Sequence, residues 1–93
     1  MFTIKKLNLT RKEVETIDKK ILELLTKRFQ ATDKIQTIKA ELGLEITQKS
    51  METDLLEKYA QKAREYGLPS DLIKKIFKMV FSYSKKTGII KRI

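Results

Sequence analysis

The sequence contains no cysteine and no histidine, and it has one proline and three glycines in 93 residues. The absence of cysteine excludes disulfide bonds and thiolate zinc sites. The absence of histidine removes the side chain that most often acts as a base or a metal ligand. No hydrophobic run approaches the roughly 20 residues that a membrane-spanning helix needs, and no signal peptide is evident. We therefore expect a soluble, cytoplasmic protein.

The charge of the chain is strongly basic. Lysine and arginine total 21 residues against 12 aspartates and glutamates, so the formal charge is +9 at pH 7. This excess favours an anionic partner or substrate. The basic residues are spread along the chain, and the lack of any longer cationic run argues against a nucleic-acid-binding tail. A chain of this length forms one domain with a modest core, so we expect residues 1–93 to be a single domain.

The segment from Arg11 to Leu42 has no glycine or proline and predicts one very long helix. Thr10 and Glu13 have the spacing of a capping box that starts the helix there, and Gly43 is expected just after its end. Such a helix is about 48 Å long, whereas a compact domain of this size has a radius of gyration near 12 Å. One copy cannot cover the whole apolar stripe, so we predict self-association. The stripe consists of Val14, Ile17, Ile21, Leu24, Leu25, Ala31, Ile35, Ile38 and Leu42.

Two shorter helices are predicted to follow. Thr47 is a candidate N-cap for a helix over about 48–66, and Gly67-Leu68-Pro69 predicts a turn before the next helix. The third helix is expected to end at about Thr87, just before Gly88. The fold class is therefore all-α, with three helices in each chain.

One position of the apolar stripe holds a cation. Arg28 continues the series 14, 21, 35, 42, and a guanidinium there is costly unless an anion meets it. Lys39 lies within roughly 20° of the same helix face and about 16 Å away along the axis, so the two can bind a small dianion together. Arg11 is rotated by about 100° from Arg28 and can reach only a neighbouring copy's site. The alternatives are a structural ion pair between Arg28 and Asp18 of the partner subunit, and ordinary solvated charges at Arg11 and Lys39.

Two further polar residues are candidates for the same site. Glu52, next to Met51 in the second helix, can face inward, although an acidic residue near a helix start is also ordinary. Ser84 continues the apolar stripe of the third helix with a hydroxyl. The alternative for Ser84 is a bond to the carbonyl four residues back.

These residues and their spacing resemble the all-helical chorismate mutases, the AroQ class. The resemblance covers nearly the whole chain and rests on short motifs that occur in order at the spacing of the family. The motifs are R-x6-D at Arg11 and Asp18, L-L-x-x-R at Leu24 to Arg28, I-K at Ile38-Lys39, G-L-x-I at Gly43 to Ile46, Glu52, and I-F at Ile76-Phe77 followed by Ser84.

The resemblance implies an intertwined homodimer of six helices with two identical sites, which use neither a metal nor a cofactor. The implied reaction is the rearrangement of chorismate to prephenate in aromatic amino-acid biosynthesis. Arg28 and the partner's Arg11 would bind the carboxylates of chorismate, and Lys39 would contact a carboxylate and the ether oxygen. Glu52 would hold the ring hydroxyl, and Ser84 would position the ring carboxylate.

Three positions depart from the family pattern. Gln48 stands where an aspartate is usual, Met51 replaces an arginine, and Gly88 replaces a glutamine or glutamate that hydrogen-bonds the ether oxygen. A missing donor of that kind costs about 10²–10³ in rate, so slow turnover is expected. The alternatives are an isochorismate-pyruvate lyase, a catalytically weak or regulatory dimer of the same fold, and a basic nucleic-acid-binding protein.

Overall fold

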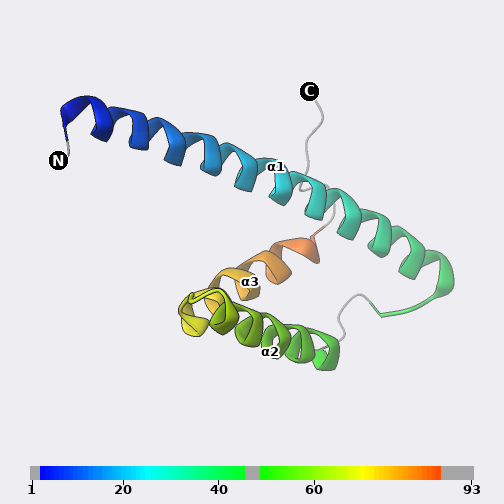
Figure 1. Cartoon of the computed structure of the whole chain (residues 1–93). Coiled ribbons are helices and arrows are strands. Elements are labelled where there is room, and N and C mark those ends of the chain that lie inside the picture. Colours follow the sequence, from blue (N-terminus) through cyan, green and yellow to red (C-terminus); the bar gives the residue numbers. More distant parts are fainter. Residues whose placement is uncertain (1–2, 46–48, 87–93) are drawn as a thin grey trace.

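The computed structural model describes residues 3–45 and 49–86, and all of its secondary structure is helical. The three helices are α1 (Ile4–Leu42), α2 (Lys49–Glu65) and α3 (Ser70–Ser84). Helices α2 and α3 form a hairpin that meets the C-terminal half of α1 at the end of α3, and α1 extends past the hairpin toward both of its own ends (Figure 1). The all-α prediction with three helices is thereby confirmed. In the described part of the chain, no helix is long and apolar enough to cross a membrane.

Helix α1 begins seven residues earlier than predicted. Thr3 is its N-cap, and the Thr3 hydroxyl accepts a hydrogen bond from the Lys6 amide at 3.1 Å. The Thr10 hydroxyl instead donates to the Lys6 carbonyl at 2.9 Å, inside the helix. The predicted capping box at Thr10 is therefore wrong, and Arg11 does not lie in the first helical turn.

The C-terminal end of α1 agrees with the prediction. Gly43 follows the last helical residue with φ of 69°, and its amide bonds to carbonyls of the last helical turn. A left-handed residue after a helix satisfies carbonyls that otherwise lack partners, and glycine adopts that conformation without steric cost.

We expect Gly43→Ala to lower the free energy of unfolding by about 1 kcal/mol. A Cβ built on Gly43 meets no heavy atom within 4 Å, so backbone strain at positive φ is the whole cost. Gly43→Asn is the control, because asparagine tolerates this conformation and should cost less. The measurement is urea unfolding of both variants, and an alanine variant as stable as the parent would contradict the expectation.

The two shorter helices lie close to their predicted ranges. Helix α2 differs by about one residue at each end, and Gly67 has φ of 72° in the predicted turn. Helix α3 ends at Ser84, before the predicted Thr87. The predicted N-cap Thr47 and the predicted stop at Gly88 lie outside the described residues.

The described core lies between α2 and α3. Ala60 and Ala63 of α2 are buried, as are Val80 and Phe81 of α3. Small residues on α2 let the helices approach, and the rings of Tyr59, Phe77 and Phe81 pack with centroids 4.7–6.4 Å apart.

An ion pair joins the two helices of this hairpin. The Lys74 ammonium lies 3.0 Å from a carboxylate oxygen of Glu57. The hydrogen bond and the charge of Lys74 lower the pKa of the Glu57 carboxyl. The pair is largely exposed, so it contributes little to stability.

The apolar stripe of α1 is uncovered over most of its length. No residue of α1 is buried, and Val14, Ile17 and Ile21 are each about half exposed. The radius of gyration is 17.4 Å, well above the roughly 12 Å of a compact domain. The prediction that one copy cannot cover the stripe is confirmed.

Candidate functional site

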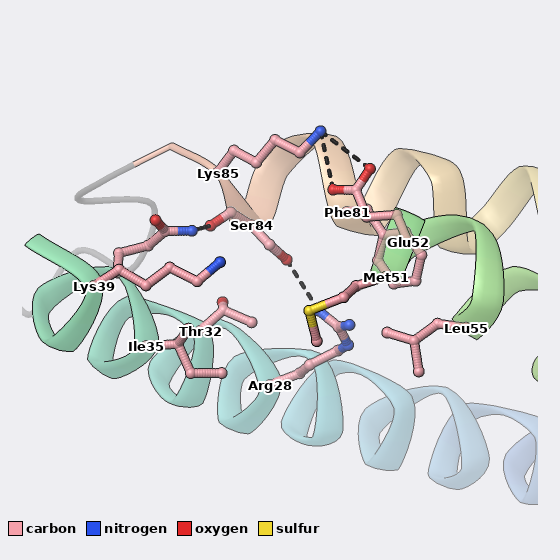
Figure 2. A pocket seen from close by; sticks show the side chains of 11 residues that line it. Arg28, Thr32, Ile35, Lys39, Met51, Glu52, Leu55, Phe81, Ser84 and Lys85 are labelled. Atoms are coloured by element: carbon pink, nitrogen blue, oxygen red, sulfur yellow. Dashed lines mark hydrogen bonds and ion pairs between the residues drawn. The ribbon is translucent and has the colours of Figure 1, made fainter. Parts of the chain in front are cut away.

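A cavity of about 210 Å³ lies between the C-terminal half of α1, the start of α2 and the end of α3 (Figure 2). Its walls combine apolar surface with several charged groups. The lining residues are Arg28, Thr32, Ile35, Gln36, Lys39, Met51, Glu52, Leu55, Phe81, Ser84 and Lys85.

Arg28 is held in the cavity by two contacts with α3. One guanidinium nitrogen donates to the Ser84 hydroxyl at 2.9 Å, and the guanidinium carbon lies 5.2 Å from the centre of the Phe81 ring. Guanidinium over an aromatic face is a favourable arrangement, worth more when it is partly desolvated. These contacts explain how a cation is accommodated in the apolar stripe before any ligand is bound.

Ser84 is buried and links α1 to α3. Its hydroxyl donates to the Val80 carbonyl at 2.8 Å while it accepts from Arg28. The two predictions for Ser84, a helix-internal bond and a role in the site, are therefore compatible. A hydroxyl has one donor and can accept at two positions, so Ser84 can donate to Val80 and accept from Arg28 at the same time.

Lys39 and Glu52 also line the cavity, from α1 and α2. Lys39 is part-buried and extends into the space above Thr32 and Ile35 (Figure 2). The Glu52 carboxylate pairs with the Lys85 ammonium, at 2.9 Å and 3.2 Å from its two oxygens. The structure thus brings together four of the residues that the sequence predicted for the site: Arg28, Lys39, Glu52 and Ser84.

The other three predicted site residues are not part of this cavity as described. Arg11 is exposed on α1, about 25 Å along the helix axis from Arg28. Within one chain it does not line the cavity, as the sequence analysis expected. Gln48 and Gly88 lie outside the described residues.

Gln36 and Lys85 line the cavity as well, and neither was predicted for the site. Gln36 donates its side-chain amide to the Ser84 carbonyl at 3.3 Å, and its amide oxygen is buried without a hydrogen-bond partner in the described chain. Helical spacing could have found Gln36, because positions 28, 32 and 36 share one face. Lys85, directly after Ser84, was counted only as part of the general basic charge.

The chemistry of the cavity follows from its charges. Arg28, Lys39 and Lys85 provide three cations against the single carboxylate of Glu52. No group of three or more metal-ligating side chains occurs among residues 3–45 and 49–86. Fold and cavity together define an all-helical domain with a cationic pocket that suits a small organic anion.

Comparison with known proteins identifies the family. The family model of type II chorismate mutases matches residues 10–88, and the chain belongs to this family of isomerases. The chain is 28% identical to a T-protein of Enterobacter agglomerans over 87% of its own length, but it spans only 22% of that protein. It is also 28% identical to a chorismate mutase of Methanocaldococcus jannaschii, over 88% of this chain and 83% of that protein. No solved structure matches the chain significantly.

Proposed function

We propose that this chain converts chorismate to prephenate. The observation that carries the proposal is the meeting of Arg28, Lys39 and Glu52 in one cavity, within a chain of the type II chorismate mutase family. Chorismate carries two carboxylates and a ring hydroxyl. Its charges suit the cations of the cavity, and the hydroxyl suits the lone carboxylate.

The reaction suits the side chains that are present. It is a unimolecular rearrangement in which one C–O bond breaks and one C–C bond forms, and it needs no nucleophile, proton transfer or cofactor. The protein therefore has two tasks. It selects the compact, chair-like conformer of the substrate, and it places fixed positive charge where the breaking C–O bond gathers negative charge.

Six residues of the cavity have roles in this mechanism. Arg28 binds a carboxylate, with its guanidinium fixed by Ser84 and Phe81. Lys39 binds a carboxylate and stabilises the developing charge on the ether oxygen. Glu52 accepts a hydrogen bond from the ring hydroxyl. Phe81 and Leu55 supply apolar surface around the ring of the substrate.

The function is tested with purified protein by following chorismate loss and prephenate formation against the uncatalysed rate. Release of pyruvate from isochorismate is measured in parallel. We expect prephenate formation above background. Pyruvate release without prephenate formation would instead identify a lyase, and absence of both would leave a protein that is not a catalyst for either substrate.

We also propose that the chain acts as an intertwined homodimer of six helices. The exposed stripe of α1 supports this, because Val14, Ile17 and Ile21 leave an apolar surface that a second copy can cover. We expect sedimentation at micromolar concentration to give a dimer whose dissociation and unfolding coincide. A folded, stable monomer would contradict the proposal.

In this dimer, Arg11 of one chain completes the cavity of the other. We expect Arg11→Ala and Arg28→Ala homodimers each to be nearly inactive. Unfolding and refolding the two variants together should restore about a quarter of the parent activity, because half of the random dimers then hold one intact site. A mixture that stays as inactive as its components would show that Arg11 acts elsewhere.

A further inference from the structure

Lys85 forms a sheltered ion pair with Glu52. It lies one residue beyond the end of α3, and its side chain and that of Glu52 are 32% and 29% exposed. In the pair between Lys74 and Glu57, by contrast, the glutamate is 65% exposed. Figure 2 shows the Lys85 ammonium against both oxygens of Glu52 at the rim of the cavity.

The charges around Glu52 indicate why its pairing with Lys85 matters for substrate binding. The preceding residue, Met51, also lines the cavity and carries no charge. Without Lys85, the cations left on the cavity walls are Arg28 and Lys39, and both belong to the proposed set of substrate-binding residues. An unpaired carboxylate would then compete with the substrate for these cations and would repel its carboxylates.

We propose that Lys85 is a positioning residue that holds Glu52 as the acceptor for the ring hydroxyl of the substrate. This inference rests on the proposed function and adds a residue to that site. An ionised carboxylate has about four lone-pair positions, so Glu52 can accept from Lys85 and from a hydroxyl at the same time. Lys85 acts through the orientation and charge compensation of Glu52 and need not contact the substrate.

The test uses two stable ligands and measures their binding to the dimer by calorimetry. One is a bicyclic ether dicarboxylic acid that imitates the chair-like transition state and carries the hydroxyl. The other is the same compound without the hydroxyl. The ratio of their dissociation constants reports the contribution of the hydroxyl, which should be about tenfold or more in the parent protein.

In Lys85→Met, we expect this ratio to fall nearly to one, as in Glu52→Ala, and the double variant should show no further fall. Lys85→Arg should keep most of the ratio, because it preserves a cation that can pair with Glu52.

Lys86→Met is the control for loss of charge, since Lys86 is exposed and its ammonium lies 4.5 Å from the Tyr83 ring centre. Lys74→Met is the control for loss of an ion pair, because it removes the pair between Lys74 of α3 and Glu57 of α2. Both controls should keep the parent ratio.

An unchanged ratio in Lys85→Met would overturn the inference. Equal weakening of both ligands would leave the ratio unchanged and would overturn the inference in the same way, because Lys85 would then act on the carboxylates of the ligand and not on the acceptance of its hydroxyl. Each of these results leaves the proposed function standing. Failure of the parent protein to bind either ligand or to turn over chorismate would instead overturn the proposed function together with the inference.

Discussion

Replacing Arg28 by alanine is expected to reduce turnover of chorismate by at least about 10³-fold, to the level of the uncatalysed reaction. Arg28 is fixed in the cavity from two sides, by the Ser84 hydroxyl and the Phe81 ring. A preorganised guanidinium loses little entropy when it binds a carboxylate, so its removal affects both binding and the rearrangement.

The fold should survive this change. Ser84 keeps its bond to the Val80 carbonyl when Arg28 is absent, so no buried hydroxyl loses all of its partners. We expect the free energy of unfolding to stay within about 1 kcal/mol of the parent. Arg64→Ala, at an exposed position of α2, is the control and should keep full activity. An Arg28→Ala protein with parental kcat/KM would place the site elsewhere.

The second large effect is expected from Lys39→Met, which removes a charge but keeps most of the apolar length of the side chain. If Lys39 faces the ether oxygen, kcat should fall by about 10²–10³-fold, with a smaller change in KM. The charge on that oxygen grows only in the transition state, so the loss is concentrated in the chemical step. Kinetics at saturating chorismate give kcat directly.

The control for Lys39→Met is Lys34→Met, which removes the same charge from an exposed position of α1. Its kcat should equal that of the parent. A rise in KM alone for Lys39→Met would mean that Lys39 binds a ground-state carboxylate and does not stabilise the developing charge. The ether oxygen would then need a different donor.

The three-helix fold was predictable because, among the described residues, glycine and proline stand only at helix boundaries: Gly43 and Gly67 after α1 and α2, and Pro69 before α3. Gly43 and Gly67 adopt positive φ, as helix-terminating residues often do. The start of α1 was not predictable from its capping pattern, because two threonines compete for that role. Thr3 caps the helix, and Thr10 bonds back to the Lys6 carbonyl, a choice that depends on whether residues 4–9 are helical.

The site residues that interrupt the apolar pattern of a single helix were predictable from the sequence. Arg28 was predicted because a cation interrupts the apolar periodicity of α1. Ser84 was predicted because a hydroxyl interrupts the apolar periodicity of α3. Helical spacing places Gln36 on the face of Arg28 and Thr32. However, its bond to the Ser84 carbonyl and the pairing of Lys85 with Glu52 depend on how the end of α3 meets α1 and α2, a tertiary contact that no local pattern encodes. The same limit applies to the bond between Arg28 and Ser84, which joins residues 56 positions apart.

The unbroken length of α1 also restricts which insertions and deletions the protein can tolerate. Arg11 and Arg28 belong to one rigid rod, so one residue inserted between them turns their directions apart by about 100° and shifts them by about 1.5 Å. In the proposed dimer, that rotation would carry Arg11 away from the neighbouring cavity even if every side chain were kept. Natural variation in length should therefore avoid residues 11–28 and collect at the ends of the chain and in the connection between α1 and α2.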